Sequence, residues 1–111
     1  MQEVYINKIT KFLPNSPISN DEMESYLGEI DGKPSKAKRL VLRSNKIKTR
    51  YYALNKQGIA THTNSQLVAE SIKLLFDKPS DIKDIEMLTA GTSSPDQFMP
   101  SHAVMVHGEL P

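Results

Sequence analysis

The stretch that decides the fold is Ile85–Ser101, which reads I-E-M-L-T-A-G-T-S-S-P-D-Q-F-M-P-S. It begins as a short apolar run, continues as a loop of small polar residues, and ends in an apolar tip, Phe98-Met99, flanked by two prolines. A buried strand followed by such a loop and then a helix is how open α/β sheets form ligand sites, beyond the carboxyl ends of their strands. We therefore expect the ligand-binding end of the chain at Thr89–Pro100.

Working outward, hydrophobic periodicity predicts the other elements. Apolar and polar residues alternate with period two in Glu3–Thr10, which predicts a strand, and Lys46–Leu54 reads as a second extended segment. Helical spacing and start signals predict four helices. They open at Ser19, at Pro34, at Asn64 and at Pro100.

Three of these helices carry specific expectations. The longest should run over Asn64–Asp77, with a capping box formed by Thr63 and Gln66. In the helix after Pro34, one face is expected to hold Ala37, Leu40, Val41 and Ser44. In the last helix, Ala103, Val104 and Val106 are expected to point inward.

The order of elements predicts an α/β chain with a mixed sheet, a parallel strand pair and flanking helices. With 111 residues, the chain is one domain or a piece of a larger one. It stops at Leu110-Pro111, where an α/β chain should enter its next strand. We therefore expect residues 1–111 to be one incomplete domain with no second domain beside it.

Composition excludes several classes of protein. The chain has no cysteine, so it has no disulfide framework and no thiol nucleophile of its own. No apolar run approaches the length of a membrane span, and the N-terminus lacks the pattern of a secretory signal. We therefore expect a cytoplasmic protein.

Basic residues gather in one part of the chain. Eight of the fourteen Lys and Arg residues lie between Lys33 and Arg50, and no acidic residue interrupts them. Such a stretch can attract an acidic partner, or it can be an ordinary solvated helix face and loop. Nucleic acid is not the expected partner, because aromatic residues follow the charges instead of alternating with them.

A catalytic site is not evident. The spacing of His102 and His107 does not place them on one helical face as a metal pair, so no metal and no cofactor is expected. Ser93 and Ser94 do not fit the G-x-S-x-G pattern, and Asp96 has no histidine partner at a recognisable position.

Four segments nevertheless occur in the order and spacing of a known family: Phe12–Pro14 with Ser19–Glu24, then Ser44–Tyr51, then Asn64–Phe76, then Asp84–Ser94 with Phe98–Ser101. They resemble the opening strand and "LP" turn, the "R-T-G-I-x-x-R" segment, the helix before the central strand and the "T-(S/T)-(S/T)…(F/M)-P" block of β-ketoacyl-acyl-carrier-protein synthase III, in the thiolase superfamily.

The resemblance implies the N-terminal part of the first half of a thiolase-like fold. It also implies the family's reaction, the decarboxylative condensation of an acyl starter with malonyl-acyl carrier protein. The catalytic Cys, His and Asn are expected beyond Pro111, so the chain alone should be inactive. Implied partners are acyl carrier protein, an acyl thioester and a second subunit in a homodimer. The residues themselves leave open a non-enzymatic partner-binding module or a small basic nucleic-acid-binding domain.

Two groups of site residues follow from the resemblance. The loop residues Thr92, Ser93, Phe98 and Met99 are expected to line an acyl pocket and the dimer contact. The alternative is that Phe98 and Met99 simply fill the core of the subunit.

The second group concerns delivery of the starter. Leu40 and Ser44 occupy the positions at which the family's coenzyme A-primed members carry Trp and Arg, and Leu cannot stack on adenine. A starter carried by an acidic carrier protein fits better, with possible docking residues Lys36, Arg39 and Arg43.

Overall fold

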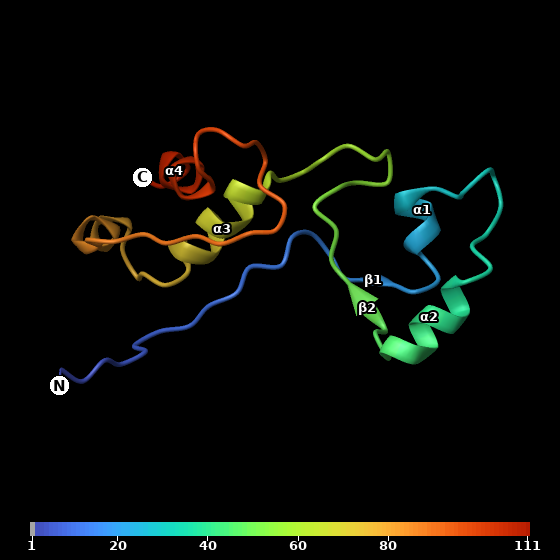
Figure 1. Cartoon of the computed structure of the whole chain (residues 1–111), viewed down its shortest axis with the longest axis horizontal. Helices are drawn as coiled ribbons and strands as arrows, with labels where there is room; N and C mark the ends of the chain where they lie inside the picture. The colour runs from blue at the N-terminus through green and yellow to red at the C-terminus, as the bar shows by residue number, and fades with distance from the viewer. Residues whose placement is uncertain (1) are drawn as a thin grey trace. The chain divides into compact units, whose positions relative to one another are not determined.

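The computed structural model describes residues 2–111, which divide into two compact units. Unit 1 contains the N-terminal residues through Leu13 together with Thr63–Pro111, and unit 2 is Pro14–His62. In chain order the elements are β1 (Ile18–Ser19), α1 (Met23–Leu27), α2 (Lys38–Asn45), β2 (Thr49–Arg50), α3 (Asn64–Lys73), the 3₁₀ helix η1 (Pro79–Asp84) and α4 (His102–Gly108) (Figure 1).

Unit 2 is built around a two-stranded antiparallel sheet. Ile18 of β1 pairs with Arg50 of β2, and the Ile18 side chain is buried. The Arg50 Nη2 atom donates to Asn20 Oδ1 at 2.7 Å, and Asn20 Nδ2 donates to the carbonyl of Ile47 at 2.9 Å. These side-chain hydrogen bonds connect the end of β1 to β2 and to the residues before it. They help to stabilise a strand pair that is only two residues long.

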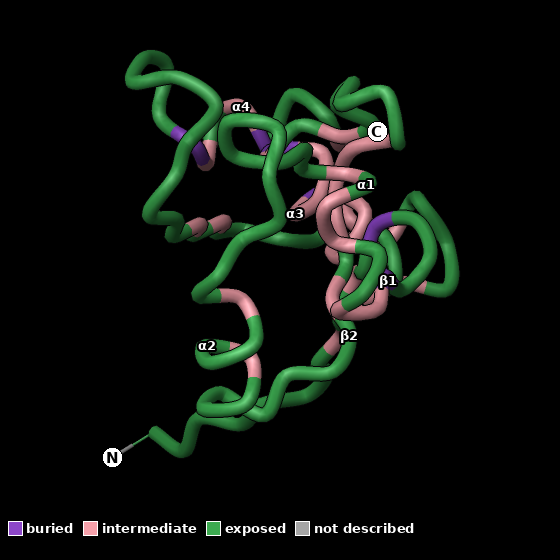
Figure 2. Tube along the Cα trace, turned by 90° about the vertical axis from the view of Figure 1, so that its right-hand side faces the viewer, coloured by how far each residue is buried: buried purple, intermediate pink, exposed green. Residues whose placement is uncertain are grey.

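Unit 1 is organised by the packing of α3 against α4. The innermost residues of α3 are Ser65 and Ala69, and those of α4 are His102 and Val106 (Figure 2). Each pair is four residues apart, so each forms one row along its helix. Small side chains on α3 let α4 approach closely, and Val106 is completely buried there.

The N-terminal segment of unit 1 lies along α3 without forming a strand. Lys8 Nζ donates to the carbonyl of Leu75 at 2.9 Å, and the Thr10 hydroxyl donates to the carbonyl of Ser71 at 2.7 Å. Side chains, not a backbone ladder, therefore hold this segment in place.

The predicted strands at Glu3–Thr10 and in the Ile85 run are wrong, and so is the parallel pairing. Within residues 2–111 the sheet is the antiparallel β1–β2 pair, and neither predicted segment belongs to it. Val4 is 92% exposed and Met87 is 79% exposed. Alternating residues give an extended backbone, but a strand also needs a partner, and none of the described segments provides one.

The helices were predicted more closely than the strands. The capping box at the start of α3 is confirmed, because Gln66 N donates to the Thr63 hydroxyl and Thr63 N donates to the Gln66 side chain. The helix ends at Lys73, earlier than the predicted Asp77, and Pro79 begins η1. Proline suits the first position of a helix, since its missing N–H has no helical partner there.

The predicted apolar face of α2 is mostly exposed, and the predicted inward face of α4 is confirmed at Val106 but wrong at Val104. Leu40 is 73% exposed and Val41 is 54% exposed, while the half-buried row of α2 is Lys38 and Leu42. In α4, Val104 is 56% exposed because it lies two positions from both His102 and Val106 and so faces the other side of the helix. The apolar residues of these short helices did not by themselves show which side packs against a neighbour.

Candidate ligand-binding surfaces

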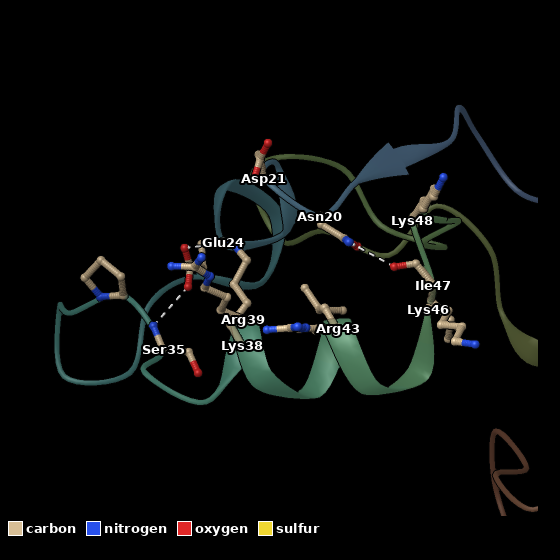
Figure 3. Close-up of a pocket in the computed structure, with 12 residues that line it drawn as sticks. Asn20, Asp21, Glu24, Ser35, Lys38, Arg39, Arg43, Lys46, Ile47 and Lys48 are labelled. Atoms are coloured by element: carbon tan, nitrogen blue, oxygen red, sulfur yellow. Dashed lines mark hydrogen bonds and ion pairs between the residues drawn. The ribbon is translucent and has the colours of Figure 1, made fainter.

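A basic groove of about 690 Å³ lies in unit 2, between α2 and the residues around the start of α1. Its basic lining residues are Lys38, Arg39, Arg43, Lys46 and Lys48. Figure 3 shows Lys38, Arg39 and Arg43 along α2, with Lys46 and Lys48 in the segment that follows the helix. The helix and the turn after it therefore gather charges that are spread over eleven positions of sequence.

Glu24 lines this groove, and its carboxylate binds the loop that precedes α2. Glu24 accepts hydrogen bonds from the backbone N–H of Ser35, at 3.0 Å, and from Lys38 Nζ, at 3.1 Å (Figure 3). The Ser35 N–H, followed by the Lys38 ammonium, lowers the pKa of Glu24 below its usual value. Glu24 thus ties the loop before α2 to α1 and neutralises one of the groove's cations.

The two arginines of the groove differ from Lys38. The ion pairs among residues 2–111 are Glu24–Lys38 and Glu70–Lys73, so Arg39 and Arg43 are not paired with a carboxylate. Both are exposed on α2. Their charges are consequently available to an acidic ligand, as are those of Lys46 and Lys48.

The structure brings together two of the three predicted docking residues. Arg39 and Arg43 line the groove, whereas Lys36 is exposed but lies outside the lining. Lys46 and Lys48 belong to the groove although the sequence did not single them out. The uninterrupted basic stretch was the signal for them, but only the turn after α2 shows that they face the same space.

The second predicted surface is the loop 92–99 of unit 1. Thr92 and Ser93 are exposed, and the Thr92 hydroxyl accepts the N–H of Ser94 at 3.1 Å. Phe98 is 94% exposed and Met99 is 80% exposed. Neither side chain is therefore buried among residues 2–111, and the two form an exposed apolar tip.

Asp96 has partners in this loop that the sequence did not reveal. Its carboxylate accepts the backbone N–H groups of Asn64, at 2.7 Å, and Ser65, at 2.8 Å. Desolvation raises the pKa of Asp96, but the N–H groups of Ser65 and Asn64, the Ser65 hydroxyl and nearby His102 together hold it below its usual value. A histidine therefore does lie near Asp96, although it makes no hydrogen bond.

Two kinds of feature are absent from the described residues. No group of three or more His, Asp or Glu side chains in residues 2–111 could hold a metal ion. Within the same residues, no helix is both long and apolar enough to cross a membrane.

Comparison with known proteins gives one consistent similarity. The chain is 27% identical over 110 residues to β-ketoacyl-[acyl-carrier-protein] synthase III 1 of Deinococcus radiodurans, covering 99% of this chain and 29% of the relative. It is 27% identical over 111 residues to β-ketoacyl-[acyl-carrier-protein] synthase III of Ehrlichia ruminantium strain Gardel, covering 99% of this chain and 31% of the relative. No protein-family model matches the chain.

Both relatives belong to one class of enzyme, the β-ketoacyl synthases, and the similarity implies a thiolase-like fold. More particularly, the chain is synthase III-like over nearly its whole length, and the resemblance read from its motifs is confirmed. The chain spans about three tenths of the length of the curated relatives that it matches. Its small sheet with flanking helices is consistent with part of an α/β fold.

Proposed function

We propose that this chain is part of a synthase III-like acyltransferase and supplies surfaces that bind the substrates of its condensation reaction. The reaction joins an acyl starter to malonyl-acyl carrier protein and releases carbon dioxide. Similarity over 99% of the chain to proteins named for this reaction is the observation that carries the proposal. The 111 residues contain no cysteine, so a thiol nucleophile has to come from another part of the enzyme.

The basic groove of unit 2 is the proposed docking site for the carrier protein. An acidic carrier is attracted by Arg39 and Arg43, which have no carboxylate partner in the described chain. Leu40, 73% exposed on the same helix, offers no aromatic face for an adenine ring. These features favour a starter delivered by carrier protein over one delivered by coenzyme A.

The loop of unit 1 is the proposed contact for the acyl chain and for a second subunit. Phe98 and Met99 provide exposed apolar surface, and Thr92 and Ser93 provide hydroxyl groups beside it. An exposed apolar tip is stabilised by burial against an acyl chain or a partner protein. We propose that the assembled enzyme is a cytoplasmic homodimer.

The proposed docking site predicts a large electrostatic effect. The double variant Arg39→Glu/Arg43→Glu should weaken binding of acyl carrier protein by about tenfold or more at low ionic strength. The reason is that both reversals turn attraction into repulsion at the groove. The difference should shrink as salt is added, since exposed charges are screened. Titration calorimetry at two salt concentrations measures both effects.

A matched control changes the net charge equally at another place. Lys11→Glu/Lys78→Glu alters two exposed lysines of unit 1 that do not line the groove. This variant should bind carrier protein almost as well as the unmodified chain. Equal affinities for the groove variant and the unmodified chain would remove the docking assignment.

The absence of a thiol predicts that the chain has no condensing activity by itself. With an acyl starter and malonyl-acyl carrier protein, the 111-residue protein should release no more carbon dioxide than buffer does. Release of labelled carbon dioxide is the measurement. Turnover above background would show that this chain contains its own nucleophile. The proposal that the nucleophile comes from another part of the enzyme would then be wrong.

A further inference from the structure

The N-terminus of α3 has all its backbone donors occupied. Within the capping box, Thr63 N donates to the Gln66 side chain and Gln66 N donates to the Thr63 hydroxyl. The two N–H groups between them, on Asn64 and Ser65, donate to Asp96. The first turn of a helix leaves such donors without helical partners, and here local side chains satisfy only half of them.

The other half is satisfied by a residue far away in the chain. Asp96 lies 32 positions from Asn64 and 31 from Ser65, and each of its carboxylate oxygens takes one N–H. A negative charge at this end of a helix is also stabilised by the helix dipole. A second bond runs beside it, from Asn64 Nδ2 to the carbonyl of Ser94. The loop is therefore attached to α3 at two points.

α4 contributes from the other side of the same cluster. His102, its first residue, is 8% exposed and packs in the row that holds Val106. His102 is the smallest of the contributions that lower the pKa of Asp96, and neither of its ring nitrogens has a hydrogen-bond partner. The groups that face Asp96 are thus the N–H groups and the Ser65 hydroxyl from α3, and His102 from α4.

We propose that Asp96 is a positioning residue that clasps the loop 92–101 onto the N-terminus of α3 and thereby sets the orientation of the Phe98-Met99 tip. The tip itself is 94% exposed at Phe98, so its own packing does not orient it. The bidentate Asp96 contact, two residues before Phe98, is the attachment next to it. The functional meaning of the clasp rests on the proposed function, in which the tip contacts the acyl chain.

The clasp has a defined direction of pH dependence. Because the pKa of Asp96 is lowered in the folded protein, the clasp is complete above the ordinary carboxyl pKa and is lost as pH falls through the lowered value. Protonation removes the charge and leaves an oxygen that accepts less strongly. An amide at position 96 should not titrate in this range.

The test uses the full 111-residue chain with a tryptophan at the tip. The unmodified chain contains no tryptophan, so Phe98→Trp introduces a single indole, and it lies at an exposed position. In this background, Asp96→Ala should lower the fluorescence anisotropy of the indole and accelerate amide exchange of Asn64 and Ser65 by about fivefold or more, as expected for a lost helix cap. Asp96→Asn should give an intermediate anisotropy that no longer changes between neutral pH and acid, and intermediate protection of the Asn64 and Ser65 amides relative to an unfolded chain at the same pH.

A matched control is Asp77→Ala, which removes one exposed carboxylate of unit 1 outside the loop. It should leave both readings unchanged. Unchanged anisotropy in Asp96→Ala would overturn the proposal, and so would an acid response that persists in Asp96→Asn. If circular dichroism showed both Asp96 variants to be unfolded, Asp96 would support the fold and not the loop, which also overturns it. No acyl ligand or carrier protein takes part, so the result is independent of the docking experiment.

Discussion

Val106→Ala is expected to lower the free energy of unfolding of unit 1 by about 2 kcal/mol. Val106 is completely buried between α4 and α3, so the substitution removes two buried carbon atoms and leaves a cavity. Neighbouring residues of α3 are small, which gives the site little means of refilling the space. Hydrogen exchange at the amides of α3 and α4 measures this quantity for unit 1 alone.

Val104→Ala is the control for that experiment. It makes the same chemical change in the same helix, but at a side chain that is 56% exposed. Alanine favours a helix over valine by about 0.5 kcal/mol at either position, so this term cancels in the comparison. Val104→Ala should therefore be neutral or slightly stabilising. Equal effects at the two positions would contradict the burial pattern of α4.

Local signals in the sequence were reliable. The Thr63–Gln66 capping box is confirmed because both partners lie within one helical turn, so no distant contact is needed to form it. Features that depend on a few adjacent residues can be read from those residues alone.

Features that depend on distant partners were missed. Glu3–Thr10 has the alternation of a strand, yet within the described chain it meets α3 and no strand. Asp96 looks like an ordinary loop residue until Asn64 and Ser65 are found beside it. A local pattern does not indicate which distant segment will pack beside it. Strand pairing and long-range contacts such as those of Asp96 are therefore seen only in the folded structure.

The basic groove of unit 2 has one feature that could be predicted from local sequence and one that could not. A continuous basic stretch led to the prediction of a docking surface, which stays a proposal, and Arg39 and Arg43 line one groove because they are four residues apart on α2. Lys36 precedes the helix and lies outside the lining. The basic stretch therefore indicated the region, and the fold of α2 with the turn after it decided which charges line one groove.

Gly28→Ala is expected to destabilise unit 2 by about 1 to 3 kcal/mol, the cost of forcing a side chain into a backbone conformation reserved for glycine. Gly28 ends α1 with φ of 78° and ψ of 176°. A Cβ atom built there would meet nothing within 4 Å, so the penalty comes from the backbone and not from a clash. Hydrogen exchange at the amides of unit 2 measures it.

Gly91→Ala provides the comparison, because its surroundings are equally open and its φ lies outside the left-handed region. That substitution should be neutral, or stabilising by up to about 1 kcal/mol through the lower entropy of the unfolded chain. If both glycine variants behaved alike, the backbone at Gly28 would not be under the constraint that its φ indicates.

The Gly28 experiment also tests how the groove is built. The chain turns at Gly28 into the loop that returns to Ser35, where Glu24 of α1 accepts the loop's N–H. If the Gly28→Ala substitution redirects the loop, the Glu24 contact should weaken and the pKa of Glu24 should rise toward its usual value, because the Ser35 N–H is the main cause of its lowering. A pH titration of the Glu24 side chain by NMR would show this shift. One glycine at the end of a five-residue helix would then control the position of a charged surface that begins ten residues later at Lys38.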